Sequence, residues 1–138
     1  MSTVLVSGGS KGLGAGLVQA FLERGDTVAT FSRSSSEQVE QWAAEYGERF
    51  YFAPLDLTDR AATAAWVKAM QAVVGDVDVL VNNAGMAYSR LLALADDDGT
   101  DQVVDLNLKG TVQLTRLISR PMLTMDGAVI INISSIVG

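Results

Sequence analysis

Three glycines, Gly8, Gly12 and Gly14, lie where they could hold a phosphate group. They follow an apolar run at residues 3–6 and lead into a stretch with helical periodicity. Glycine lets a backbone turn sharply and approach a pyrophosphate closely, while the free N–H groups at a helix start attract negative charge. The spacing is Gly-x-x-x-Gly-x-Gly, because the commoner Gly-x-Gly-x-x-Gly pattern would need a third glycine at Leu17. This segment therefore predicts a phosphate-binding turn between a strand and a helix.

Two basic residues, Lys11 and Arg33, occur where they could distinguish a ribose 2′-phosphate from a 2′-hydroxyl in a dinucleotide. In dinucleotide-binding folds, an acidic residue about 20 positions after the glycine turn binds the ribose 2′-hydroxyl, whereas an arginine accommodates a 2′-phosphate. Arg33 occupies that place, and Lys11 adds a second positive charge from within the turn. A guanidinium group matches a phosphate through two parallel hydrogen bonds. The pattern favours NADPH over NADH, and the alternative is that both side chains are ordinary solvated charges.

Composition excludes several other classes of site. The chain has 138 residues, 49% of them hydrophobic, which suits one domain over residues 1–138. It lacks cysteine and histidine, so it has no disulfide framework and no imidazole for a zinc cluster, and we expect no metal. Residues 8–12 also match the Gly-x-Ser-x-Gly elbow of α/β-hydrolases, but no histidine is present to activate the serine.

Charge and hydropathy indicate a protein of the cytoplasm. The net charge is −6, which argues against nucleic acid as a partner because phosphate binding needs clustered Lys and Arg. No apolar run approaches the roughly 20 residues that a membrane-spanning helix requires. We therefore expect a cytoplasmic protein that binds neither nucleic acid nor membrane.

Strand-like and helix-like stretches alternate, which predicts an α/β fold with a parallel sheet covered on both faces. Strands are expected at residues 3–7, 27–32, 50–55, 78–81 and 128–133, and helices at 12–24, 37–46, 59–74 and 100–117. Two strand-helix units before the crossover and two after it predict the strand order 3-2-1-4-5, a doubly wound Rossmann sheet. Ligands bind such sheets beyond the carboxyl ends of the strands, where the polar candidates Ser7, Arg33, Asp56, Asn82, Ser134 and Ser135 fall.

Local signals refine these boundaries. The first helix is expected to bury Leu13, Leu17, Val18, Phe21 and Leu22 on one face and to end at Gly25. Ser34, Ser35 and Ser36 should open the second helix, and Thr58 or Asp59 should cap the third. Pro121 and Gly127 are expected to bracket the exit of the long helix.

Four further motifs follow the glycine turn: LDLTD with Asp56, NNAG at residues 82–85, NLKG with Asn107, and NISSIVG at residues 132–138. With these motifs in this order, the chain resembles the short-chain dehydrogenase/reductase family over essentially its whole length. Within the family it looks most like the 3-oxoacyl-[acyl-carrier-protein] reductases. The resemblance implies an NADPH-dependent enzyme that reduces a ketone to a secondary alcohol. A small-molecule or acyl-carrier-bound carbonyl compound, such as a 3-oxoacyl thioester, would be its substrate.

The resemblance also assigns roles to residues. Cofactor contacts would fall to Ser7, Gly8, Ser10, Lys11, Gly12, Leu13, Gly14, Arg33, Asp56, Leu57, Asn83, Ala84 and Gly85. Asp56 would bind the adenine amino group beside a backbone contact from Leu57, and Asn83 would lie along the cofactor ribose. Asn107 would bend its helix and hold a water in a proton relay. Ser135, chosen over Ser134, would hydrogen-bond the substrate carbonyl oxygen.

Plainer interpretations of the same residues stay open at this point. Asp56 could cap the following helix, and Asn82 and Asn83 could simply close a turn. Asn107 lies among apolar residues, where a buried amide would need partners, but it could instead face solvent.

The family's proton donor is a tyrosine four residues before a lysine, on the helix that follows the fifth strand. None of Tyr46, Tyr51 and Tyr88 has a lysine at that spacing. We therefore expect the amino-terminal part of a longer reductase, with the carboxyl-terminal strands and helices absent from these 138 residues. Two alternatives are a catalytically silent NADP(H)-binding or scaffold module, and a partner chain that supplies the acid. The complete protein is expected to be a homodimer or homotetramer.

Overall fold

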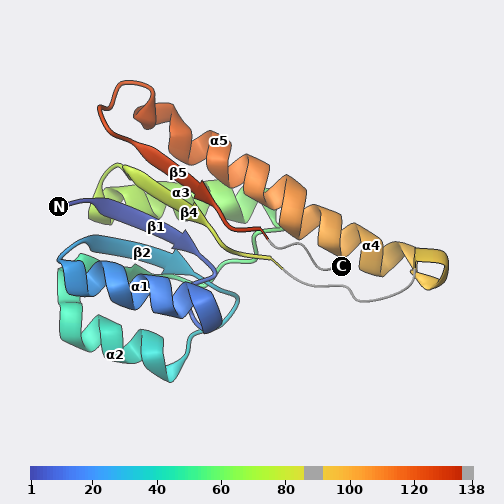
Figure 1. Ribbon diagram of the computed structural model, residues 1–138, viewed down its shortest axis with the longest axis horizontal. Helices are drawn as coiled ribbons and strands as arrows, with labels where there is room; N and C mark the ends of the chain where they lie inside the picture. Colours follow the sequence, from blue (N-terminus) through green and yellow to red (C-terminus); the bar gives the residue numbers. More distant parts are fainter. Residues whose placement is uncertain (86–91, 135–138) are drawn as a thin grey trace.

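The computed structural model describes residues 1–85 and 92–134, and they form a five-stranded parallel sheet between two helical layers (Figure 1). The strands are β1 (Thr3–Ser7), β2 (Thr27–Phe31), β3 (Phe50–Phe52), β4 (Val79–Asn82) and β5 (Val129–Asn132). Their order is β3-β2-β1-β4-β5, which confirms the predicted doubly wound topology. The register places Val4 beside Val28 on one side and Val79 on the other.

The helices are α1 (Gly12–Arg24), α2 (Glu37–Tyr46), α3 (Arg60–Val74), α4 (Asp97–Val104) and α5 (Thr111–Met122). A π-helical segment, η3 (Asp105–Gly110), joins α4 to α5, and two short 3₁₀ turns are η1 (Gly47–Arg49) and η2 (Leu92–Leu94). The helices α1 and α2 cover one face of the sheet, and α3 and α5 cover the other (Figure 1). The helix α4 extends past the edge at which the strands end (Figure 1).

Each face of the sheet has its own apolar core. Val4, Val6 and Val28 pack with Val18 of α1 and Trp42 of α2. On the opposite face the core combines strand residues with residues of α3 and α5: Leu5, Ala29, Phe31, Leu80, Trp66, Val67, Met70, Leu114, Ile118 and Met122. Because side chains alternate along a strand, both faces of the central strands are buried, as parallel sheets require.

Several local signals act as predicted. Gly25 ends α1 in the left-handed conformation with φ of 100°, and Ser36 caps α2 by accepting a hydrogen bond from the N–H of Val39 at 3.2 Å. Asp59, one of the two candidates, caps α3 by accepting from the N–H of Ala62 at 2.9 Å.

Other boundaries differ from the prediction. The third strand ends at Phe52 rather than at residue 55, since Pro54 has no N–H for a ladder. The expected helix at 100–117 is a longer run that begins at Asp97, because Asp96 accepts a hydrogen bond from the N–H of Gly99 at 2.7 Å. The run ends at Met122 rather than at residue 117, so Pro121 is the last residue but one of α5, and the end of the helix lies between Pro121 and Gly127 as predicted.

The predicted inward face of α1 is wrong at Leu13. Its side chain is 60% exposed, whereas Val18 and Leu22 are buried. Leu13 belongs to the first turn of α1, which lies at the carboxyl edge of the sheet, beyond the reach of the core.

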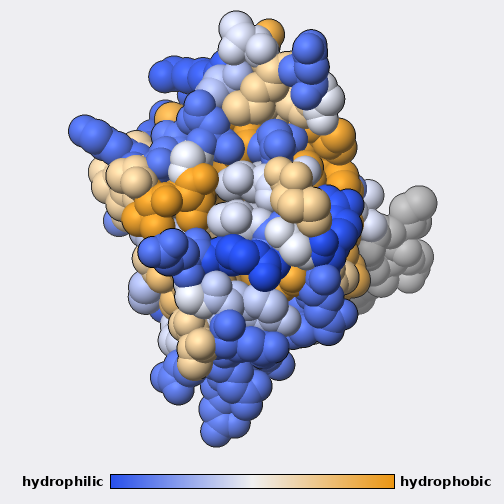
Figure 2. All heavy atoms as spheres, turned by 90° about the vertical axis from the view of Figure 1, so that its left-hand side faces the viewer, coloured by the Kyte–Doolittle hydropathy of each residue, from blue (hydrophilic) through white to orange (hydrophobic). Residues whose placement is uncertain are grey.

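The opposite edge, where the strands begin, faces the viewer in Figure 2. Hydrophilic residues cover much of this side, and apolar ones lie in separate patches (Figure 2). Among the described residues, the structure has no helix with the length and apolarity that crossing a bilayer demands.

Candidate nucleotide-binding site

Neighbouring atoms leave no room for side chains at two glycines of the turn between β1 and α1. A Cβ atom on Gly14 would lie 2.2 Å from the carbonyl oxygen of Gly8 and 2.5 Å from Nδ2 of Asn83. Gly8 has a φ of 71°, and a Cβ atom there would lie 3.1 Å from Cα of Ala84. Glycine at these two positions is therefore required by close approach and, at Gly8, by the left-handed backbone.

Asn83 and Ser7 fasten this turn to the end of β4. The Asn83 Nδ2 atom donates to the carbonyl oxygens of Ser7 and Gly8, each at 3.2 Å. In return, Oγ of Ser7 accepts from the N–H groups of Asn83 and Ala84 at 2.9 and 2.8 Å. The side chains of both residues are thus used to join two strand ends. Their predicted contacts with a cofactor stay predictions.

Thr30 supports the glycine turn, and the sequence analysis does not single it out. It is fully buried in β2, its Oγ1 donates to the carbonyl oxygen of Val6 at 2.6 Å, and the N–H of Gly9 donates to the same Oγ1 at 2.9 Å. A Cβ atom on Gly9 would lie 2.2 Å from that oxygen, so Gly9 must also be glycine. Thr30 looked like an ordinary β-branched strand residue, and no spacing in the sequence distinguishes it.

The start of α1 differs from the starts of α2, α3 and α4. Side chains cap α2, α3 and α4, whereas the N-cap residue of α1, Lys11, makes no side-chain cap hydrogen bond. No acidic residue lies in the first turn of α1, and a Cβ atom on Gly12 would have no atom within 4 Å. This helix start therefore presents N–H groups and a positive dipole end to open space, which suits an anionic ligand.

A comparison with known families shows which family the chain belongs to. The profile of the short chain dehydrogenase family matches residues 2–138. The chain belongs to the short-chain dehydrogenase family.

Two relatives within this family illustrate the similarity. The 3-oxoacyl-[acyl-carrier-protein] reductase FabG of Chlamydia muridarum is 31% identical over 137 residues, which cover 97% of this chain and 55% of the relative. The NADP-dependent 3-hydroxy acid dehydrogenase YdfG of Shigella flexneri is 33% identical over 136 residues, covering 98% and 54%. The chain therefore spans about half the length of these relatives.

A solved structure supports the same assignment. The closed form of serine dehydrogenase complexed with NADP⁺ matches with a TM-score of 0.86 and 32% identity, over 96% of this chain and 54% of that one. Both the fold and the binding of a nicotinamide dinucleotide therefore have a precedent among similar short-chain dehydrogenases.

Asp56 does not cap α3, because Asp59 does. Its Oδ1 atom accepts from the N–H of Thr58 at 3.0 Å and from the Thr58 hydroxyl at 2.6 Å. These two hydrogen bonds, with a further contribution from the positive charge of Arg33, lower the pKa of Asp56 against the opposing effect of burial. Asp56 is therefore an exposed carboxylate near Arg33 at neutral pH. Its predicted contact with adenine stays a prediction.

Arg33 and Lys11 are both exposed, and neither forms a salt bridge with another described residue. Ser10, the residue before Lys11, is hydrogen-bonded to the start of α2, since Oγ of Ser36 donates to its carbonyl oxygen at 3.3 Å. The start of α2 thus holds the middle of the glycine turn in place.

Asn107 lies in the π-helical segment, and its predicted roles in bending the helix and holding a water stay predictions. Its side chain is exposed, which is the second of the two alternatives that the sequence left open. A Cβ atom on Gly85 would lie 3.2 Å from Oδ1 of Asn107, which places this amide against the turn that follows β4. Gly110, in the same segment, is buried against Leu57, whose carbonyl oxygen would lie 2.9 Å from an added Cβ. The predicted role of Leu57 toward a cofactor stays a prediction.

The predicted catalytic Ser135 lies outside the described residues, and so does the segment at residues 86–92 that is expected to line the substrate pocket, apart from its last residue. Ser134 is the last residue described, and it is exposed.

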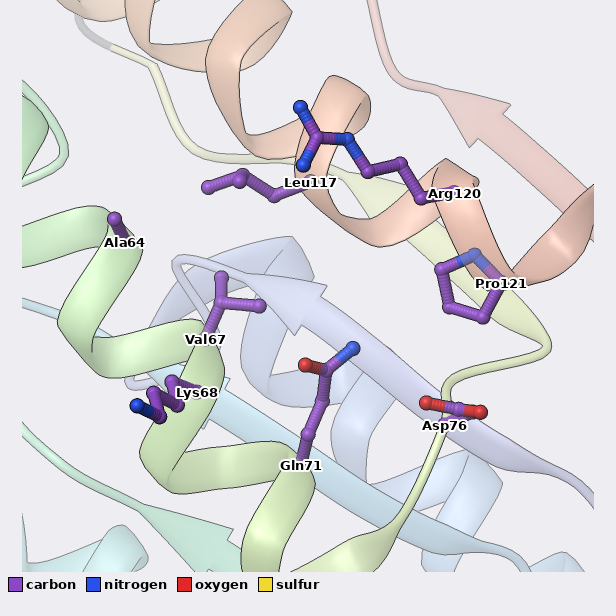
Figure 3. Close-up of a pocket in the computed structure, with 8 residues that line it drawn as sticks. All are labelled: Ala64, Val67, Lys68, Gln71, Asp76, Leu117, Arg120 and Pro121. Atoms are coloured by element: carbon purple, nitrogen blue, oxygen red, sulfur yellow. The ribbon is translucent and has the colours of Figure 1, made fainter.

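A hollow of about 360 Å³ lies elsewhere, between α3 and α5 (Figure 3). Val67 and Gln71 lie on one side of it, and Leu117 and Pro121 lie on the other. Asp76, which also lines it, comes just before β4 and so lies at the edge where the strands begin. The hollow is therefore separate from the glycine turn, which lies at the opposite edge.

Proposed function

We propose that the protein is an NADPH-dependent short-chain reductase that converts a ketone to a secondary alcohol. The single observation that carries this proposal is the start of α1, where a glycine-lined turn meets helix N–H groups without a side-chain cap. When bound there, NADPH supplies the hydride for the reduction. The residues placed to hold its pyrophosphate are Gly12, Leu13 and Gly14, through their backbone N–H groups.

The preference for NADPH rests on Arg33 and Lys11. Both cations are exposed at the carboxyl edge, where a 2′-phosphate on the adenosine ribose would meet them. Asp56, held as a carboxylate by Thr58, keeps a negative charge near Arg33. The YdfG relative is named as NADP-dependent, and the similar serine dehydrogenase was solved in complex with NADP⁺, which supports the same choice.

Replacing Arg33 tests this preference. In Arg33→Ala, the dissociation constant for NADPH should rise by about 10- to 100-fold, the effect of losing a charge-assisted hydrogen bond, while that for NADH changes less than about twofold. Cofactor fluorescence titration measures both constants. The control is Arg116→Ala, which removes an exposed arginine on α5. An equal loss for both cofactors would contradict a 2′-phosphate contact.

The substrate proposal is a 3-oxoacyl thioester. It rests on the similarity to the 3-oxoacyl reductase of Chlamydia muridarum and to the 3-hydroxy acid dehydrogenase YdfG, since both names describe interconversion of a carbonyl and a hydroxyl group at carbon 3. Asn107, which lies against Gly85, is the residue that we propose to hold a water for proton transfer. Ser135 remains the proposed hydrogen-bond donor to the substrate oxygen.

The test is to mix the natural polypeptide that carries these residues with NADPH and a 3-oxoacyl thioester and to follow the loss of NADPH absorbance. Turnover supports the reductase. Tight NADPH binding without turnover on any ketone would instead support the silent NADP(H)-binding module, because the 138 residues contain no Tyr-x-x-x-Lys pair.

A further inference from the structure

The side-chain amide of Asn82 joins three elements of the fold. It lies at the end of β4, 94% buried, and its Nδ2 atom donates to Oγ1 of Thr115 in α5 at 3.0 Å and to Oδ1 of Asn132 in β5 at 2.9 Å. The carbonyl oxygen of Asn82 also accepts from the N–H of Ile133 at 3.0 Å. Among the described residues, Oδ1 of Asn82 is buried and has no hydrogen-bond partner.

Each joined element continues into a residue of the proposed site. Asn82 precedes the turn whose Asn83 side chain holds the glycine turn. Thr115 lies eight residues after Asn107 on the same continuous helical run. Asn132 ends β5, three residues before Ser135 in the sequence.

The helical run meets the end of β4 and the segment that follows it at two points. Asn107 lies against Gly85, and Thr115 accepts the hydrogen bond from Asn82, the last residue of β4. These two contacts, to residues three apart in the sequence, fix how far the helix is displaced along its axis. The position of Asn107 over the turn therefore depends on the contact at Thr115.

We propose that Thr115 and Asn132 are positioning residues that hold Asn107 and the end of β5 in register with the turn that follows β4. This inference rests on the proposed reductase function. Nδ2 of Asn82 has two N–H bonds and two acceptors, so removal of one acceptor leaves a buried donor unpaired. An unpaired N–H of Asn82 is less unfavourable if the helix or β5 shifts so that water can reach it. Such a shift displaces Asn107 or the end of β5.

The consequence for catalysis is specific. Thr30, Ser7 and Asn83 hold the glycine turn without help from Thr115, so cofactor binding should survive its replacement. Small displacements of a group that takes part in proton transfer lower the rate of the chemical step. Loss of the Thr115 hydroxyl should therefore lower kcat rather than raise the KM for NADPH.

The experiment compares three variants of the natural polypeptide. Thr115→Val removes the hydroxyl and keeps the shape, Thr115→Ser restores the hydroxyl, and Ser119→Ala is the control one turn further along α5. The Ser119 hydroxyl contacts the carbonyl oxygen of Arg116 in its own helix. Steady-state kinetics gives kcat and KM, and amide hydrogen exchange of peptides reports the register independently of turnover.

In Thr115→Val we expect kcat to fall by about tenfold with the KM for NADPH within about twofold, and Thr115→Ser to recover most of kcat. Exchange should rise in peptides covering residues 79–85, 105–115 and 129–134 and stay unchanged at residues 18–31. Unchanged kcat and exchange in Thr115→Val would overturn the inference, as would an equal rise of exchange in all peptides or a failure of the serine variant to recover.

The two proposals fail separately. If the unmodified polypeptide reduces no ketone, the reductase proposal fails, while the exchange data still decide whether Thr115 holds these three segments in register.

Discussion

At the scale of single residues, the glycine turn owes its shape to contacts within the turn and to Asn83, which is distant in sequence. Gly14 is excluded from carrying a side chain by the Gly8 carbonyl and by Asn83, which is placed there by β4. The same helix contains Gly16, which is exposed and has no atom within 4 Å of an added Cβ. Of these two glycines, two residues apart, Gly14 has no room for a side chain, whereas Gly16 has open space for one.

This contrast gives a matched prediction. Gly14→Ala should destabilise the fold by about 1–3 kcal/mol through overpacking and weaken NADPH binding at least tenfold, because the Gly8 carbonyl must move. Gly16→Ala should stabilise the fold by about 0.5–1 kcal/mol, since alanine favours a helix over glycine. Urea unfolding and cofactor titration measure the two effects. Equal behaviour of the two variants would show that the contact with Gly8 does not constrain the turn.

At the scale of elements, Thr30 connects β2, β1 and the glycine turn through one oxygen atom. It donates to Val6 and accepts from Gly9, so both hydrogen-bonding functions of its hydroxyl are used in a fully buried place. The relative positions of two strands and the turn therefore depend on a side chain that carries no motif.

Thr30→Val keeps the shape and removes both hydrogen bonds. We expect a loss of about 1–3 kcal/mol in the free energy of unfolding, because the Gly9 N–H and the Val6 carbonyl stay buried without this partner. The control is Thr27→Val in the same strand, whose half-buried side chain makes no described hydrogen bond and which should change stability by less than about 0.5 kcal/mol. Chemical denaturation measures both variants, and a similar small effect in each would contradict the role of Thr30.

At the scale of the whole molecule, two apolar cores leave β5 partly uncovered. Val81 is 1% exposed, whereas Ile131, its partner in β5, is 40% exposed, because the layer of α1 and α2 does not extend that far. Val104, Leu108 and Val112 are also exposed on the run from α4 to α5. These apolar residues fit the expectation of self-association, which stays a prediction.

The amino-terminal edge of the molecule depends on one buried carboxylate. Asp26 accepts from the N–H of Ser2 at 2.9 Å and from Nε of Arg24 at 2.6 Å. Burial opposes ionisation of Asp26, but these hydrogen bonds and the charge of Arg24 outweigh it and lower the pKa below the ordinary value of 3.8. The folded state therefore binds this proton less readily than the unfolded state does.

A lowered pKa in the folded state contributes stability that is fully present above the unfolded value and is lost as the pH falls through the folded one. The free energy of unfolding should therefore decrease from about pH 4 downward. Asp26→Asn should reduce this dependence and lower the stability at pH 7, whereas the exposed control Asp76→Asn should keep the slope. Urea unfolding across this range measures both, and an unchanged slope in Asp26→Asn would assign the acid sensitivity to other carboxylates.

The sequence by itself determined the order of the elements, the strand order, the place of the glycine turn and the family. These follow from local information. The strand and helix periods alternate, residues such as Ser36 and Gly25 cap helices, and the short motifs can be recognised without knowledge of their tertiary contacts. The observed boundaries differ from the predicted ones where a single residue decides them. Pro54 ends β3 early, and Asp96 starts α4 early.

Only the tertiary structure decided how these residues work together. Thr30 and Thr115 have no local signature, and the motif that begins at Asn132 does not specify the partner of its side chain, because these hydrogen bonds join residues 21 to 50 positions apart. The exposure of Leu13 and Asn107 likewise depends on where the sheet ends beneath each helix, which a periodic pattern does not specify. Long-range packing, not residue type, set the geometry of the site.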